Sequence, residues 1–126
     1  MTYLEKWFDY NRRQKEIEAL LEETIAQQSE QRLTLKEFYL LYYLNLAQEK
    51  SLRQIDLPDK LHLSPSAVSR MVARLEEKNC GLLSRRCCDQ DRRASFICLT
   101  DEGQTTLAYL QNAVEERLEM SLDFIS

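Results

Sequence analysis

Residues 64–100, SPSAVSRMVARLEEKNCGLLSRRCCDQDRRASFICLT, carry the strongest structural signals in the chain. Ser64 is a residue type that caps helices with its hydroxyl, and Pro65 follows at a position where a missing N–H is harmless. Apolar residues then recur at helical spacing and predict a helix that ends near Lys78. This stripe consists of Ala67, Val68, Met71, Val72 and Leu75. The other face carries short or cationic side chains, which suit a helix that lies along a groove.

The segment after this helix predicts a β-hairpin. Asn79 and Gly81 can both take the left-handed conformation that ends a helix. Residues 81–86 (GLLSRR) and 94–100 (ASFICLT) read as two short strands, and the stretch CCDQDRR between them is polar, basic and turn-prone. A helix followed by a basic two-stranded wing predicts a winged helix-turn-helix. The expected fold class is therefore mainly α with a small β wing (α+β).

The remaining chain reads as further helices. Residues 3–28 predict a long first helix, and Thr34 and Glu37 have the spacing of a capping box at the start of a second. Residues 38–44 (FYLLYYL) are apolar on all sides, so the second helix should be buried in the middle of the protein.

Two shorter signals complete the pattern. Asp56 is expected to cap a short helix with Pro58 in its first turn, after an extended segment at residues 52–54. Thr100 is expected to cap a last helix whose apolar residues recur at spacings of three and four. These apolar residues are Leu107, Leu110, Val114, Leu118, Leu122 and Ile125.

Composition and charge narrow the classes of function. The chain has 126 residues and a net charge of −4, enough for one modest domain. Residues 64–93 hold seven basic and four acidic residues, a net charge of +3, so the remainder carries −7. Such a split suits a protein with one face toward phosphate. The charged N-terminus does not resemble a signal peptide, and no apolar run approaches the roughly 18 residues of a membrane span. We therefore expect a cytoplasmic protein with reduced cysteines and no membrane contact.

At these residues the chain resembles the MarR family of bacterial transcription regulators, over roughly residues 33–103. The matching pieces are the helix sequence LSPSAVSRMVARLEEKN, the signature Asp91-Arg92-Arg93 and the sequence Leu99-Thr100-Asp101-Glu102-Gly103. The sequence LTLKEFYLLYYL is also similar to the SarA-like branch, a weaker match. The resemblance implies a single domain over residues 1–126. Within it, residues 33–100 form the winged-helix DNA-binding lobe, and residues 1–32 and 101–126 form dimerisation helices.

The candidate DNA contacts come from the helix and the wing. Short side chains permit close approach to base edges, and arginine can bond guanine or phosphate. The expected contacts are Ser64, Ser66, Ser69, Arg70, Arg74, Arg85, Arg86, Arg92 and Arg93. The resemblance implies that Asp91 braces the wing loop and that Arg93 reaches the minor groove, with Arg92 as the other candidate. The alternative is a set of solvated surface charges, with ion pairs worth roughly 0–1 kcal/mol.

The cysteines and tyrosines offer two candidate routes of control. Cys80, Cys87 and Cys88 are candidate redox residues because neighbouring arginines favour the thiolate, and packing in strands is the alternative that suits Cys98 best. The spacing of cysteines and the single His62 give no zinc signature, so no metal is expected. The resemblance also points to an aromatic-ligand pocket, against the plainer alternative of core packing. Its candidate residues are Phe38, Tyr39, Tyr42 and Tyr43.

These patterns predict a sequence-specific regulator, most simply a repressor that binds an inverted-repeat operator in double-stranded DNA as a homodimer. Its control would come from thiol oxidation or from a small aromatic ligand, and no cofactor is expected. A winged-helix module that binds protein and not DNA is the alternative, although such a module needs neither the basic helix nor the wing. A thiol enzyme has little support because His62 is the only imidazole, so no catalytic residue is assigned.

Overall fold

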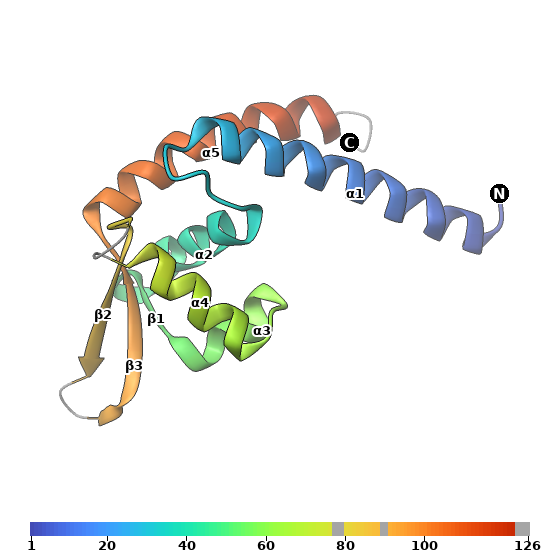
Figure 1. Ribbon diagram of the computed structural model, residues 1–126. Coiled ribbons are helices and arrows are strands. Elements are labelled where there is room, and N and C mark those ends of the chain that lie inside the picture. The colour runs from blue at the N-terminus through green and yellow to red at the C-terminus, as the bar shows by residue number, and fades with distance from the viewer. Residues whose placement is uncertain (77–79, 89–90, 123–126) are drawn as a thin grey trace. The chain divides into compact units, whose positions relative to one another are not determined.

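The computed structural model describes residues 1–76, 80–88 and 91–122, and its side-chain description covers residues 1–76, 80–85 and 95–122. The chain falls into two compact units, Lys36–Tyr109 and Met1–Leu35 with Leu110–Ser126, so the boundary lies within the last helix. The elements of Figure 1 are α1 (Tyr3–Gln28), α2 (Leu35–Leu46), η1 (Gln48–Lys50), β1 (Ser51–Arg53), η2 (Gln54–Asp56), α3 (Leu57–Leu61), α4 (Pro65–Leu75), β2 (Leu83–Cys88), β3 (Asp91–Leu99) and α5 (Asp101–Leu122).

The wing hairpin consists of β2 and β3, and β1 completes a three-stranded antiparallel sheet in the order β1-β3-β2. β3 lies in the middle, so Cys98 pairs with Ser51 on one side and with Ser84 on the other. The extended segment expected at residues 52–54 is confirmed at Leu52 and Arg53, which belong to β1, but Gln54 is already the first residue of η2. The predicted loop is too long, because β2 continues through Cys88 and β3 begins at Asp91. Backbone hydrogen bonds between antiparallel strands can continue into polar residues, so residue types alone underestimate the length of the two strands.

Helix α4 begins as predicted and ends early. Ser64 Oγ accepts a hydrogen bond from the Ala67 N–H at 3.1 Å, and Pro65 occupies the first turn. The helix ends at Leu75 and not near Lys78, because Glu76 is extended (ψ 164°) and its carbonyl accepts from the Cys80 and Gly81 N–H groups. Gly81 has φ +74°, which confirms the predicted left-handed exit there, while Asn79 lies outside the described residues.

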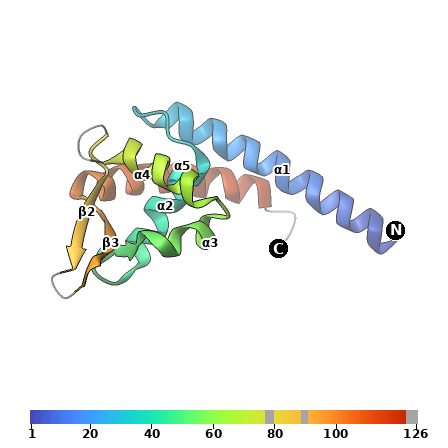
Figure 2. The ribbon, with the colours of Figure 1, turned by 60° about the horizontal axis from the view of Figure 1, so that its bottom comes forward.

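The buried face of α4 matches the predicted stripe. Val68, Val72 and Leu75 are at most 1% exposed, and Ala67 and Met71 are half-buried. Burying each large apolar side chain contributes roughly 1.5–3 kcal/mol relative to exposure. Helix α3 lies beside α4 in both views (Figures 1 and 2).

The capping role expected for Asp56 is wrong. Its side chain makes no cap hydrogen bond to α3, and its own backbone is helical. The Asp56 carboxylate instead accepts from Arg53 Nε at 3.1 Å. The 3-10 helix η2 runs directly into α3, so the backbone of Asp56 is helical and not extended. A capping side chain needs the extended backbone to accept from the N–H groups of the first helical turn. Pro58 does stand in the first turn of α3, as predicted.

Thr100 joins the wing to α5. Its Oγ1 accepts from the Gly103 N–H at 2.9 Å, which confirms the predicted cap, and donates to the Gly81 carbonyl at 2.7 Å. Gly103 is buried, and a Cβ added there would lie only 2.3 Å from the Leu82 carbonyl oxygen, so only glycine fits. The first turn of α5 therefore packs directly against the backbone that leads into β2.

Helix α2 is buried on most of its surface, as its apolar sequence predicts. Leu40, Leu41 and Leu44 are fully buried and Phe38 is 5% exposed, whereas Tyr42 is 38% exposed. The other buried apolar residues of this unit are Leu57, Leu61, Val68, Val72, Leu75, Leu82, Leu83, Ile97, Cys98, Leu99 and Leu107. The sheet and the helices of this unit thus share a leucine-rich interior.

In the other unit, the two ends of α1 differ in burial. Leu21 and Ile25 are buried near its C-terminal end, whereas Trp7 and Phe8 are 57% and 64% exposed. The apolar residues of α1 are therefore covered near its C-terminal end and exposed near its N-terminal end. In α5, Leu110 and Val114 are buried, and exposure increases to 38% at Leu122.

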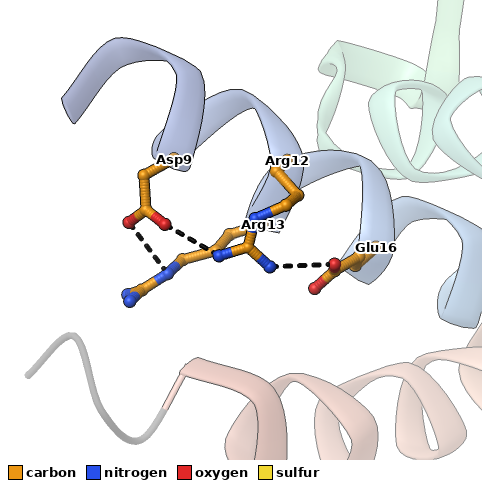
Figure 3. A network of polar contacts seen from close by, with 4 residues as sticks. All are labelled: Asp9, Arg12, Arg13 and Glu16. Atoms are coloured by element: carbon orange, nitrogen blue, oxygen red, sulfur yellow. Dashed lines mark hydrogen bonds and ion pairs between the residues drawn. The ribbon is translucent and has the colours of Figure 1, made fainter. Parts of the chain in front are cut away.

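The exposed half of α1 also carries a charged network (Figure 3). Asp9 pairs with Arg12 at 2.8 Å and with Arg13 at 3.2 Å, and Glu16 pairs with Arg12 at 3.1 Å. The hydrogen bond to Asp9, and then the one to Glu16, raise the pKa of the Arg12 guanidinium above its usual value. These pairs lie three or four residues apart and support the helix locally. Among the described residues, no helix is both long and apolar enough to cross a membrane.

Candidate nucleic-acid interface

The outer face of α4 presents most of the predicted base contacts. Ser64, Ser66, Ser69 and Arg70 are all exposed. The Ser64 and Ser66 hydroxyl oxygens lie 3.3 Å apart, so the residue that caps the helix also contacts a candidate base reader. This face therefore combines hydroxyl groups with a guanidinium, and both can bond base edges or phosphates.

Arg74 has an acidic partner within the chain. Its Nη1 donates to Glu37 Oε2 of α2 at 2.7 Å, and the Glu37 side chain is only 5% exposed while that of Arg74 is 40% exposed. A buried carboxylate needs such a partner, because an unpaired charge in the interior is costly. The role of Arg74 in reading DNA stays a prediction, and the structure gives it a second role in anchoring α4 to α2.

Arg85 belongs to a hydrogen-bonded chain that we call the Gln54 network, consisting of Glu76, Arg85, Gln54 and Ser69. Arg85 Nε donates to Glu76 Oε1, and Arg85 Nη1 donates to Gln54 Oε1 at 3.0 Å. Gln54 Nε2 then donates to Ser69 Oγ at 3.2 Å. The network joins β2, η2 and α4, so the base of the wing is tied to the helix beside it.

The remaining wing contacts cannot be located as side chains. Arg86 lies in β2, and Asp91, Arg92 and Arg93 lie at the start of β3. Their side chains lie outside the described residues, as do those of Cys87 and Cys88. Their expected roles therefore stay predictions. Cys80 is half-buried and Cys98 is 5% exposed, and both are free thiols. The burial of Cys98 suits the packing role expected for it.

The four aromatic residues predicted to line a ligand pocket have different surroundings. Phe38 is buried, and its ring centroid lies 6.4 Å from that of Tyr39. Tyr42 is exposed and lies 6.2 Å from Tyr43, over whose ring Lys60 Nζ stands at 5.7 Å. Core packing therefore accounts for Phe38. The ligand-binding role of the others stays a prediction.

Sequence reasoning missed three residues that organise this surface. Glu37 was assigned to a helix cap, and neither Gln54 nor Glu76 was assigned a partner. Each makes its contact with a residue between nine and 37 positions away. The one sequence signal for these contacts is the number of arginines in the predicted helix and wing, because buried or clustered arginines need acidic or amide partners nearby.

A serine-capped helix with a polar and cationic outer face, beside an antiparallel hairpin, defines a winged helix-turn-helix protein. The model of the MarR family matches residues 33–95, half of the chain. The chain belongs to this family, which confirms the resemblance seen in the sequence and the predicted fold class. The named relatives are transcriptional regulators, in agreement with the expectation of a regulator and not an enzyme.

Known relatives match both the sequence and the fold. The HTH-type transcriptional repressor MdtR of Bacillus subtilis is 33% identical over 81 residues, which is 64% of this chain and 50% of that protein. The matched part thus spans half the length of this relative. Sco3205 of Streptomyces coelicolor, a MarR family transcriptional regulator solved in complex with DNA, has a TM-score of 0.86 at 24% identity over 100% of this chain and 80% of that one. AbsC of the same organism has a TM-score of 0.86 at 22% identity over 100% of this chain and 83% of that one.

Proposed function

We propose that this protein is a cytoplasmic, sequence-specific transcription regulator that binds double-stranded DNA and represses the genes it controls. The observation that carries the proposal is the outer face of α4, where Ser66, Ser69 and Arg70 are exposed beside the β2–β3 hairpin. A capped helix of this kind can enter the major groove, and an adjacent basic hairpin can reach the neighbouring minor groove. The family match includes α4 and β2 and ends within β3.

In this proposal, base reading and positioning belong to different residues. Ser66, Ser69 and Arg70 read base edges. Ser64, at the start of α4, contacts the sugar-phosphate backbone of the DNA. Arg92 or Arg93 enters the minor groove, whose negative potential favours a cation, and Asp91 braces that part of the wing. Arg85 and Arg86 neutralise phosphates, which gives affinity without sequence preference.

The proposed active form is a homodimer. Exposed apolar residues concentrate at the start of α1, where Tyr3, Leu4, Trp7, Phe8 and Tyr10 are each more than half exposed. Contiguous apolar surface of this kind marks an interaction site, and a second copy of the chain is the occupant that supplies two DNA-reading helices. Two such helices suit an inverted-repeat operator with half-sites roughly 34–36 Å apart.

Control of DNA binding is proposed to act through one of two routes. One route is oxidation at Cys80, Cys87 or Cys88, which would add bulk next to the wing. The half-buried position of Cys80 at the start of that segment supports this route. The other route is an aromatic ligand near Tyr39, Tyr42 and Tyr43, and the 38% exposure of Tyr42 supports it. Release of bound DNA by peroxide or by phenolic compounds distinguishes the two.

One observation favours the alternative of a winged-helix module that binds protein. Arg74 and Arg85 are paired with Glu37 and Glu76, so two of the expected DNA contacts are partly neutralised within the chain. We favour DNA because Arg70 and the serine face are exposed and because a phosphate can compete for the exposed part of an arginine.

The experiment that tests the proposal is selection of bound sequences from a pool of random duplex DNA. A DNA-reading regulator should enrich an inverted repeat, and Arg70→Ala should weaken the enrichment at one base pair in each half-site. Lys15→Ala, on exposed α1, is the control and should enrich the same repeat as wild type. A pool that stays random after several rounds would favour the protein-binding alternative.

A further inference from the structure

The Gln54 network has a fixed hydrogen-bond direction. An arginine side chain only donates, so the oxygen of the Gln54 amide must face Arg85 and its NH₂ group must face Ser69. Amide oxygen and nitrogen are otherwise hard to distinguish, but here the partner fixes their assignment. It follows that Ser69 Oγ accepts from Gln54, and that this hydroxyl keeps its hydrogen for another partner.

Among the residues that the structure describes, Gln54 is the hydrogen-bond partner of the Ser69 side chain. Ser69 is exposed on the outer face of α4, so a bound ligand can supply an acceptor for its hydroxyl hydrogen. A serine hydroxyl usually donates or accepts according to its surroundings. With one of its two lone pairs occupied by Gln54, Ser69 keeps its hydrogen and a single lone pair, which favours donation to a ligand.

We propose that Gln54 is a positioning residue that orients Ser69 to donate its hydroxyl hydrogen to an acceptor atom in the major groove. This inference rests on the proposed function, since it requires α4 to lie in that groove. The acceptors available there are guanine N7 and O6, adenine N7 and thymine O4, whereas the cytosine amino group offers only a donor. Gln54 thus favours recognition by Ser69 of bases that offer an acceptor, although Gln54 itself makes no base contact.

The network also ties this donor to the wing. Arg85 bonds both Gln54 and Glu76, and Glu76 directly follows the last residue of α4. The donor on α4 and the start of β2 are therefore held by one continuous set of hydrogen bonds. Such linked bonds fix side-chain directions better than isolated pairs on a surface.

The substitution Gln54→Glu tests the direction of the chain. A carboxylate at position 54 still accepts from Arg85, but it can no longer donate to Ser69. Ser69 would then donate its hydrogen to the carboxylate, and only the lone pairs of its hydroxyl would face the DNA. We expect Gln54→Glu to lose preference at the same base pair that Ser69→Ala affects, by about two- to tenfold, the value of one hydrogen bond. In the Ser69→Ala background, Gln54→Glu should change preference at that base pair no further.

The matched control is Gln48→Glu, which adds the same charge at an exposed position in η1 of the same unit. It should weaken all duplexes alike and leave the base preference unchanged. The preferences are measured by selection from random duplex DNA for each variant, after thermal melting has established that each is folded. A Gln54→Glu protein that keeps the wild-type preference, or changes it no more than Gln48→Glu does, overturns the proposal. If Gln54→Glu fails to fold, Gln54→Ala is compared with Gln48→Ala by the same criterion.

A second measurement separates failure of this inference from failure of the proposed function. In the DNA-free protein, the nuclear magnetic resonance signal of the Arg85 Nε–H should move in Gln54→Ala and stay in place in Gln48→Ala. An unmoved signal overturns the network itself. A wild-type protein that selects no DNA sequence while this signal moves overturns the proposed function, and with it the DNA-reading role of Ser69.

Discussion

Arg70, Arg74 and Arg85 carry the same charge but meet different surroundings. Arg70 is exposed on α4, Arg74 pairs with a buried carboxylate of α2, and Arg85 bonds Glu76 and Gln54 at the base of the wing. An arginine with a buried acidic partner contributes to stability, because its removal takes a charged hydrogen-bond partner from that acid. An exposed arginine contributes mainly to what it binds. The three substitutions should therefore differ in which property they change.

The first prediction concerns stability. Arg74→Ala should lower the free energy of unfolding by about 1–3 kcal/mol, because the buried Glu37 carboxylate loses a charged hydrogen-bond partner. Chemical denaturation measures the loss. Adding Glu37→Gln to Arg74→Ala should recover part of it, and Arg70→Ala alone should stay within about 0.5 kcal/mol of wild type. Equal stability of the Arg70 and Arg74 variants would argue against an anchoring role.

The second prediction concerns DNA reading. Arg70→Ala should cost roughly 1–3 kcal/mol on the selected duplex and relax preference at one base pair, as expected for a base contact. Arg86→Ala should weaken every sequence alike and reduce the salt slope by about one phosphate contact. Arg85→Ala should do the same and also relax preference at the base pair that Ser69 contacts, because it frees the Gln54 amide. Binding titrations at several salt concentrations, on selected and random duplexes, measure both effects. Losses of equal size on both duplexes for Arg70→Ala would remove it from the base readers.

At the level of elements, local signals were sufficient to predict most of the winged helix. The Ser64 and Thr100 caps are confirmed because a cap depends on residues three positions apart. The capping role predicted for Asp56 and the helix end near Lys78 were wrong, because each depends on how the next segment continues. The contacts of Gln54 could not be predicted, since its two partners lie 15 and 31 residues away and no local pattern specifies them.

The third prediction concerns the junction of the wing and α5. Gly103→Ala should destabilise the protein by roughly 1–3 kcal/mol or more, as overpacking does, because the new Cβ would lie 2.3 Å from the Leu82 carbonyl oxygen. Backbone cannot move aside as a flexible side chain can. Thr105→Ala, at an exposed site in the same helix, is the control and should change stability by about 0.5 kcal/mol or less. Equal melting temperatures for both variants would contradict the close packing of Gly103 against the Leu82 carbonyl.

At the level of the whole molecule, charge and apolar surface are concentrated in different parts of the sequence. The net charge of −4 is the sum of a basic segment at residues 64–93 and an acidic remainder. The largest exposed apolar side chains stand mainly at the start of α1, outside the unit that holds α4 and the wing. The proposed contacts with DNA and the proposed contacts with a second copy of the chain therefore lie in different units.

The fourth prediction concerns assembly. Replacing both Trp7 and Phe8 by alanine should weaken the proposed dimer by about 2 kcal/mol or more, the usual cost of removing aromatic residues at the centre of an interface. Light scattering at micromolar concentration should then give the monomer mass where wild type gives the dimer. Lys15→Ala should remain dimeric. A wild-type protein that is monomeric at this concentration and still binds DNA tightly would exclude the homodimer.

The central claim is that α4 and the wing recognise a particular DNA sequence. The most direct test is the ratio of dissociation constants for a selected duplex and for a scrambled duplex of the same length and composition, measured at physiological salt. A specific regulator should bind the selected duplex at least about 1,000-fold more tightly. Equal dissociation constants for the two duplexes would contradict sequence-specific recognition by this protein.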